Sequence, residues 1–222
     1  MPIKKKKFGK GHVIYNQEFE VLLQSPVFLN AFELVRTIKP LSVPFSLEVN
    51  GEKKYFNLRR TKKDYFPFLD RATAKGANFP QPILSIWDPE KQRHHLVISH
   101  EPVVSLKQFL LSNIPNKRKL AALRSIAGEL LKLKKLKIRH GNIVYTNIFI
   151  AKGDVILLTN PEIDRDITDH IQSDLEQFRE MLFHLERELD HEPSLLWEAV
   201  QKDKFINLHF AKPVTKKRSV RL

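Results

Sequence analysis

Residues 139–150 read RHGNIVYTNIFI, and the polar residues of this stretch decide how the chain is interpreted. His140 is followed by a glycine and then by Asn142, and a second asparagine, Asn147, comes five residues later. Glycine and asparagine favour turns, whereas the apolar run that follows favours a strand. The stretch therefore predicts a polar loop that leads directly into a short strand.

The segments on either side of this loop predict regular structure. Residues 117–137 form the best helical pattern of the chain, because apolar residues recur on one face at Leu123, Ile126, Ala127, Leu130 and Leu133. After the loop, two short apolar strands are expected at 147–151 and 154–158, joined by Lys152-Gly153. A helix from about 172 to 189 follows, with a capping box of Ser173 and Glu176, and a last helix is expected near 194–206.

The first half of the chain is richer in strands. Residues 45–59, FSLEVNGEKKYFNLR, alternate apolar and polar residues around Asn50-Gly51, which is a strong hairpin signal. Two further strands are expected at 83–87 and 94–99. Three shorter signals complete this part: Pro26 excludes one continuous helix over 18–38, Pro67 starts a short helix within 64–78, and Ser105 caps another.

Strands that precede helices in this way predict an α+β fold with two lobes. We expect a basic N-terminal tail over 1–12, a reduced β-rich N-lobe over 13–99, a helical C-lobe over 100–211, and a basic C-terminal tail over 212–222. The adjacent His94 and His95 lie in a predicted strand, so their side chains point to opposite faces and cannot bind one metal ion together. They are expected to be surface residues.

The excess of basic residues is concentrated at the two ends of the chain. The net charge is +13, and residues 1–12 and 212–222 each carry five basic residues and no acidic one. Such ends either contact phosphates, on nucleic acid or on an anionic membrane surface, or are solvated arms. Neither end interleaves aromatic residues with its charges, as single-strand binders do, so solvated ends are favoured and nucleic acid is not expected as a partner.

Composition excludes several classes of protein. With 42% hydrophobic residues the chain can form a sizeable core, and without cysteine it has neither disulfides nor thiolate metal sites. No apolar run is long enough for a transmembrane helix, and no apolar segment follows the N-terminal lysines as in a secretory signal. We therefore expect a cytoplasmic protein, with peripheral attachment to the inner membrane as an option.

The order of these elements resembles the protein-kinase-like fold over roughly residues 45–190. His140-Gly141-Asn142 with Asn147 resembles the catalytic loop of small-molecule and atypical kinases, and HLVISHEPVVSLKQFLL, 95–111, resembles the strand, hinge and helix that bind the nucleotide. Within that superfamily, NGEKKYFNLRRT, 50–61, and TNPEIDRDITDHIQSDLEQF, 159–178, are similar to segments of bacterial lipopolysaccharide core-sugar (heptose or Kdo) kinases.

The resemblance implies a role for each matched residue. Arg59, Ile98 and His100 would contact a nucleotide, Asn142 would occupy the position of the catalytic base, and His140 is expected to be structural rather than a base. Metal-binding positions would fall at Asn147, at Thr159 or Asn160, and, if the following loop folds back, at Glu162 or Asp164. Asp174, which opens a helix, resembles the aspartate that holds the loop from below.

Several of these residues lack the chemistry of phosphoryl transfer, which needs a phosphate cradle, a lysine, metal ions and a carboxylate. Asn142 is an amide and no base, Arg59 replaces the lysine, and neither Thr159 nor Asn160 carries a charge for Mg²⁺. The cradle is also absent, because residues 13–44 contain no glycine.

Two functions are left open. The favoured one is a pseudokinase: a catalytically degenerate binding or regulatory module without a cofactor, whose partner is a protein or a sugar-lipid of the cell envelope. The alternative is a divergent kinase that uses ATP and Mg²⁺ to phosphorylate a lipopolysaccharide core sugar or another small hydroxyl acceptor.

Overall fold

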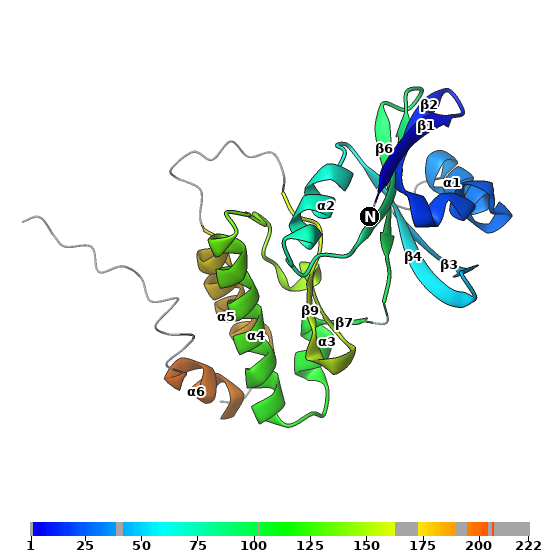
Figure 1. Cartoon of the computed structure of the whole chain (residues 1–222). Helices are drawn as coiled ribbons and strands as arrows, with labels where there is room; N and C mark the ends of the chain where they lie inside the picture. The colour runs from blue at the N-terminus through cyan, green and yellow to red at the C-terminus, as the bar shows by residue number, and fades with distance from the viewer. Residues whose placement is uncertain are drawn as a thin grey trace, which may run out of the picture.

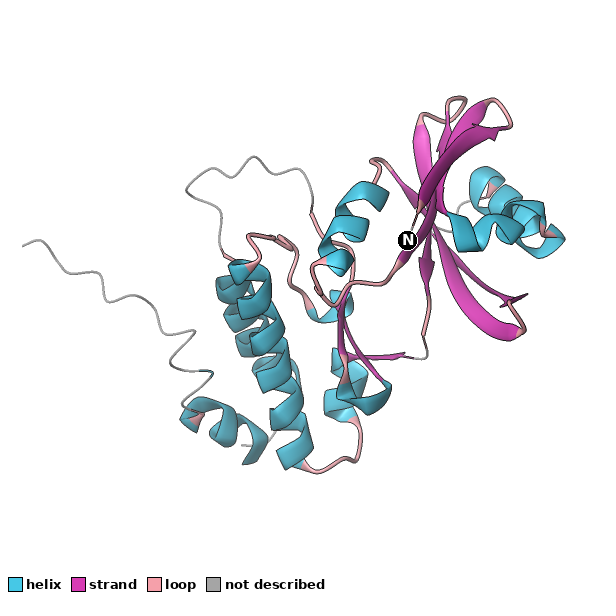
Figure 2. Ribbon diagram, in the orientation of Figure 1, coloured by secondary structure: helices cyan, strands magenta, loops and turns pink. Residues whose placement is uncertain are grey.

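The computed structural model describes residues 2–38, 42–101, 103–162, 173–189, 195–203 and 206. These residues form an α+β protein in which a six-stranded antiparallel sheet lies at one end and the long helices at the other (Figures 1 and 2). The strands of the larger sheet are β1 (Ile3–Phe8), β2 (Gly11–Asn16), β3 (Ser42–Val49), β4 (Glu52–Thr61), β5 (Pro82–Asp88) and β6 (Arg93–Ser99), in the spatial order β1-β2-β5-β6-β4-β3.

The N-terminal lysines belong to this sheet, so the tail expected over residues 1–12 is wrong. Residues Ile3–Phe8 form the edge strand β1, which pairs antiparallel with β2 from Ile3↔Asn16 to Phe8↔Gly11. The lysines alternate between the two faces of the sheet, and Lys6 binds Glu20 at 2.8 Å. The prediction failed because β1 is mostly lysine and none of its residues is fully buried, so its own sequence does not show that it pairs with β2. The C-terminal tail expected over 212–222 lies outside the described residues.

Two helical segments cover one face of the larger sheet. They are the 3-10 helix η1 (Gln17–Gln24) and α1 (Pro26–Thr37), which are separated at Ser25, so that no continuous helix forms over 18–38, as predicted. Their apolar side chains pack with those of the strands in one hydrophobic cluster, whose largest members include Phe28, Phe56, Leu58 and Leu84. This cluster holds β1–β6 together with η1 and α1.

The opposite face packs on α2 (Phe66–Ala74) and, through it, on the helical part. A second hydrophobic cluster runs from Leu96 and Ile98 on β6 through α2 into the remaining elements. These are β7 (Val103–Ser105), α3 (Leu106–Leu111), α4 (Asn116–Lys135), β8 (Ile148–Ala151), β9 (Ile156–Leu158), α5 (Asp174–Leu189) and α6 (Leu195–Lys202), with short 3-10 turns η2 (Tyr145–Asn147) and η3 (Lys152–Asp154). The apolar face predicted for α4 is buried throughout.

Local sequence signals set several of these boundaries. The Asn50-Gly51 turn joins β3 and β4, and both residues have positive φ, as the hairpin signal requires. Ser105 and Gln108 form a reciprocal capping box at the start of α3, and Ser173 and Glu176 form the predicted one at α5. The smaller sheet has the strand order β7-β8-β9. Its hairpin, β8–β9, corresponds to the two strands predicted at 147–151 and 154–158, and β8 also pairs with β7, the strand just before α3.

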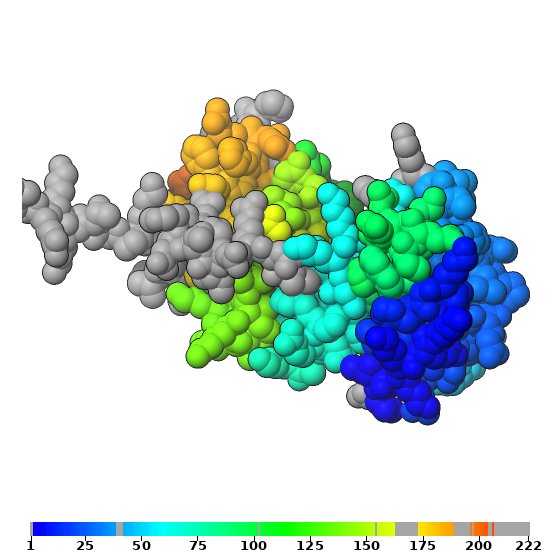
Figure 3. All heavy atoms as spheres, turned by 90° about the horizontal axis from the view of Figure 1, so that it is seen from above, coloured from blue at the N-terminus to red at the C-terminus, as the bar shows by residue number. Residues whose placement is uncertain are grey.

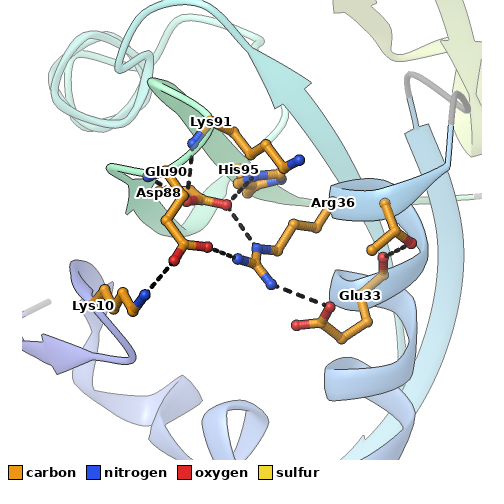
Figure 4. A network of polar contacts seen from close by, with 8 residues as sticks. Lys10, Glu33, Arg36, Asp88, Glu90, Lys91 and His95 are labelled. Carbon is orange, nitrogen blue, oxygen red and sulfur yellow. Dashed lines mark hydrogen bonds and ion pairs between the residues drawn. The ribbon is translucent and has the colours of Figure 1, made fainter.

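An ion-pair network fixes α1 to the turns of the larger sheet (Figure 4). Arg36 on α1 donates to Asp88 Oδ2 at 2.9 Å and to Glu90, and Glu90 also accepts from Lys10 in the β1–β2 turn at 2.6 Å. The β1–β2 turn approaches β5 so closely that a Cβ at Gly11 would lie 1.8 Å from the carbonyl oxygen of Trp87. Only glycine fits there.

His95 departs from its expected place on the surface. Its side chain is fully buried beneath α1, with its ring 5.0 Å from that of Phe32. Within the described residues neither ring nitrogen has a hydrogen-bond partner, and Asp88 Oδ2 lies 3.9 Å from Nε2. The prediction treated the strand as exposed, because a sheet face covered by a distant helix is not visible in the strand's own pattern.

Among the helices of the described residues, none is both long and apolar enough to cross a membrane.

Candidate functional site

The loop after α4 is held by the first turns of α5. The Asp174 carboxylate accepts hydrogen bonds from the backbone N–H groups of His140, at 2.8 Å, and Gly141, at 2.7 Å. One turn further on, Gln177 accepts from the backbone of Ile143 at 2.8 Å and donates to the Gly141 carbonyl at 3.3 Å. A carboxylate that accepts two backbone hydrogen bonds is a strong anchor, so the loop is fixed before any ligand arrives.

His140 is a fully buried structural residue at the base of this loop. Its Nε2 lies 3.0 Å from the carbonyl oxygen of Thr159, and its Nδ1 accepts from the backbone N–H of Asn142 at 3.2 Å. The His140 ring also stacks on Phe79, with the centroids 5.9 Å apart. Burial lowers the pKa of His140 to about 4, so the ring is neutral near pH 7.

Three asparagines from different segments bind one another in a closed cycle. Asn142 donates to the Asn160 carbonyl at 3.4 Å, Asn160 donates to Asn147 Oδ1 at 2.9 Å, and Asn147 donates to the Asn142 carbonyl at 3.1 Å. We call this group the asparagine cycle. Asn160 follows β9 in a left-handed conformation, with φ +55°, which asparagine tolerates better than most residues. The cycle uses amide donors that carboxylates do not have.

Arg59 on β4 reaches the cycle from the larger sheet. Its guanidinium donates to Asn160 Oδ1, although the two residues lie 101 positions apart in the sequence. Burial lowers the pKa of Arg59, and its Nε is buried without a hydrogen-bond partner in the described part of the chain. Buried charges are normally paired, so an Arg59 side chain with only an amide partner leaves room for an anion.

A pocket of about 290 Å³ opens beside Arg59, between the larger sheet and the segment after β9. Its polar lining comes from Arg59, Arg60, Thr61, Lys62, Tyr65, Thr159 and Asn160, and its apolar lining from Leu69, Pro80, Leu96, Ile98, Leu158 and Pro161. No carboxylate of the described residues lines it. The pocket therefore combines basic side chains with an apolar lining, which suits an anionic group attached to a flat or apolar body.

Glu162 lies on the other side of the asparagine cycle. Its backbone N–H donates to the His140 carbonyl at 2.6 Å, and its Cβ would lie 3.0 Å from a Cβ at Gly141, whose φ is +74°. Gly141 is thus required both by conformation and by space. Burial and the nearby Glu162 raise the pKa of Tyr65. Asp164, the other acid suggested for metal binding, lies outside the described residues.

The structure brings together most of the residues selected from the sequence. Arg59, Asn142, Asn147 and Asn160 meet in one place, and Ile98 lines the adjacent pocket. Of the two candidates after β9, the Asn160 side chain reaches Arg59, whereas Thr159 is buried, with its Oγ1 3.4 Å from the Asn147 carbonyl.

His100 is the exception. It is absent from the residues that line the pocket, and its backbone N–H donates to the Tyr55 carbonyl at 2.9 Å. The sequence gives no sign that this N–H is already used by β4.

Two residues of the site were missed. Gln177 follows Asp174 by three positions on the same helical face, so helical spacing could have identified it as a second anchor of the loop. Tyr65 lines the pocket from the start of α2, and no sequence signal distinguishes it from a core residue.

The site is better suited to an anion than to a metal ion. Mg²⁺ is usually held in proteins by carboxylates and water. The asparagine cycle offers neutral amides instead, and the side-chain oxygens of Asn147 and Asn160 already accept hydrogen bonds. The described residues contain no group of three histidine or acidic side chains arranged to bind a metal ion. Among the described residues, three basic side chains, Arg59, Arg60 and Lys62, line the pocket beside the asparagine cycle, and the position where the resemblance expects a base holds the amide Asn142.

No protein-family model matches this sequence, and no curated protein matches it either.

Proposed function

We propose that the protein is a catalytically degenerate, kinase-like binding module, and that its cleft binds an anionic ligand without magnesium. The observation that carries this proposal is the asparagine cycle, with the Arg59 guanidinium donating to Asn160 and a basic pocket beside it. If the resemblance holds, amides would stand at the positions where a phosphotransferase needs a base and a metal-binding acid.

The placement of the residues supports the kinase-like, two-lobed part of the proposal. Arg59, on strand β4 of the larger sheet, donates a hydrogen bond to Asn160, which follows the β8–β9 hairpin. An acid at the start of a helix, Asp174, holds the histidine-glycine-asparagine loop from behind. These relations link elements far apart in the sequence, and the one made by Asp174 is the relation that the resemblance implies. Residues 13–44, where the resemblance would put the phosphate cradle, contain no glycine.

The electrostatics of the pocket favour binding over catalysis. Arg59 has no carboxylate partner among the described residues, and Arg60 and Lys62 add positive charge to the lining of the same pocket. An anion that entered would compensate the cost of burying the guanidinium, which gives the site affinity for phosphate-bearing ligands. As the resemblance implies, the physiological ligand or partner would be a sugar-lipid of the cell envelope or a protein that presents such a group.

A thermal-shift titration tests the proposal. We expect ATP or pyrophosphate in the presence of EDTA to raise Tm by about 5–10 °C at roughly a hundred times Kd, because selective binding stabilises the native state. Arg59→Met should abolish the shift, whereas Lys53→Met, a matched change of an exposed cation on the same strand, should leave it intact. A shift that requires Mg²⁺, or one that persists in Arg59→Met, would contradict the proposal.

Glu162 supports a second candidate, the divergent kinase. It lines the hollow of about 470 Å³ on the other side of Asn142, together with Glu180 and Glu188. In this alternative, ATP and Mg²⁺ would bind in the cleft, and Glu162 would replace the missing metal ligand or base. Transfer of label from γ-³²P-ATP to a lipopolysaccharide core sugar or another small hydroxyl acceptor, lost in Glu162→Gln, would establish this alternative and overturn the non-catalytic reading.

A further inference from the structure

Cross-strand pairing places the N-terminal lysines beside a line of rings. Lys7 on β1 lies opposite His12 on β2, His12 opposite Trp87 on β5, and Trp87 opposite His94 on β6. Residues directly opposite each other in a sheet point to the same face. These four side chains, together with Lys5, which lies two residues before Lys7 on the same face of β1, are called the basic-aromatic row.

The row crosses four neighbouring strands at the outer margin of the face that α2 covers. In the view from above, the dark blue β1–β2 segment and the green β5–β6 segment lie side by side (Figure 3). Strands lie about 4.8 Å apart, so the row is roughly 14 Å long. Lys5 and Lys7 are exposed, and the three rings are partly exposed. The row is therefore accessible, and its rings are held by the sheet.

Two of the three rings lie against each other. The Trp87 and His94 rings lie with centroids 4.8 Å apart and an interplanar angle of 43°. Burial lowers the pKa of His94, so that ring is neutral near pH 7 and offers a stacking surface. Gly11, the only residue type that fits against the Trp87 carbonyl, brings His12 and Trp87 together.

The charges of β1 divide by face. Lys6, on the opposite face, is paired with Glu20 at 2.8 Å and lies over the Tyr15 ring. For Lys5 and Lys7 the structure gives no ion pair with any described residue. Positive charge without a counter-ion thus remains on the face that carries the rings.

From this juxtaposition we infer that the basic-aromatic row binds single-stranded nucleic acid. Lysines that meet phosphates beside aromatic rings that stack on bases are the two components of sequence-tolerant single-strand binding. An anionic membrane fits less well, because Ile3 is the only strongly exposed large apolar side chain of the described residues on β1, β2, β5 and β6. This inference uses none of the residues of the asparagine cycle and is independent of the proposed function.

Fluorescence anisotropy with a short labelled oligodeoxythymidylate tests the inference on the full-length protein. Lys5→Gln/Lys7→Gln should weaken binding and make the slope of log K against log salt shallower by about 1.4, or 0.7 per lysine. The matched control, Lys4→Gln/Lys6→Gln, changes the same number of charges on the opposite face of the same strand and should leave the salt slope unchanged. Equal effects of the two pairs would mean that bulk charge alone binds, and would overturn the inference.

The stacking component is tested separately. Trp87→Leu should weaken binding about 5- to 150-fold, whereas Trp87→Phe, which keeps an aromatic face, should lose less. A Trp197→Phe background leaves Trp87 as the only tryptophan, and its fluorescence should be quenched by the oligonucleotide even if Trp87→Leu folds poorly. No salt-dependent oligonucleotide binding, or binding only to phosphatidylserine vesicles, would overturn the inference.

Discussion

The two buried histidines provide a paired test of how this fold uses polar groups. Burial lowers the pKa of both His95 and His140 from 6.5 to about 4. Both ring nitrogens of His140 have partners, whereas those of His95 have none within the described residues. We therefore predict that replacement by leucine at pH 7.5 destabilises the protein at His140 but not at His95.

The magnitudes follow from burial and hydrogen bonding. Burying a polar group without a partner costs about 1–3 kcal/mol, so removing the His95 imidazole should stabilise the fold. Leucine will not pack perfectly in the same space, and this offsets part of the gain. His95→Leu should therefore leave the free energy of unfolding unchanged or raise it by about 1 kcal/mol. His140→Leu removes a buried hydrogen bond and leaves the Asn142 N–H without its acceptor, and should lower the free energy of unfolding by about 2 kcal/mol.

The pH dependence gives an independent readout. Because the folded-state pKa of His95 is below the unfolded value, the unfolded protein binds the extra proton as pH falls from 6.5 to 4. Stability is therefore lost across this window, at about 1.36 kcal/mol for each pH unit and each histidine, or about 2 kcal/mol per histidine between pH 7.5 and 5. His95→Leu should lose about 2 kcal/mol less than the wild type over that range.

Urea denaturation at pH 7.5 and pH 5, followed by circular dichroism, measures both quantities. If His95→Leu is as destabilised at pH 7.5 as His140→Leu, then His95 has a partner that stabilises the fold and the reasoning is wrong. An unchanged loss of stability between pH 7.5 and 5 in His95→Leu would likewise refute it, since His95 would then not titrate with a depressed pKa.

Three further predictions test other parts of the structure. Asp174→Ala should cost about 2–4 kcal/mol in urea denaturation and speed hydrogen exchange in residues 139–143, because two backbone donors lose a charged acceptor; Asp174→Asn, which keeps an acceptor, should cost less. Gly11→Ala should expose β1 to hydrogen exchange and proteolysis while the spectrum of the helices is unchanged, because its Cβ cannot fit against Trp87. Ser105→Ala, which removes the cap of α3, should cost about 1 kcal/mol, and an unchanged urea midpoint would contradict the capping role.

Local signals predicted most of the elements. The Asn50-Gly51 turn, the apolar face of α4 and the two capping boxes each depend on residues close together in the sequence, and each forms as expected. The strands β3 and β4 were predicted because apolar and polar residues alternate in their own sequences. The element order and the α+β class followed from these.

Residues whose environment comes from distant segments could not be predicted in this way. Lys5 and Lys7 were assigned to a tail because their own segment is mostly lysine, and the Trp87 and His94 rings on the same face of the sheet lie 80 or more positions away in the sequence. His95 is buried by α1, which packs on the sheet through the hydrophobic cluster and contacts β5 through Arg36 and Asp88. Pairing across strands decides the first case, and coverage by a distant helix decides the second.

The asparagine cycle explains why amides in this cleft are a stable arrangement. Three carboxylates at the positions of Asn142, Asn147 and Asn160 would repel one another unless a cation joined them. Amides at the same positions donate to one another in sequence, so the loop, the strand end and the turn after β9 are joined without an ion. Changing one amide to an acid adds a charge but removes one donor of the cycle. Asn142→Asp alone should therefore weaken the cycle without creating a metal site, and the pair Asn142→Asp/Asn160→Asp is the smallest change that offers Mg²⁺ two carboxylates beside Arg59.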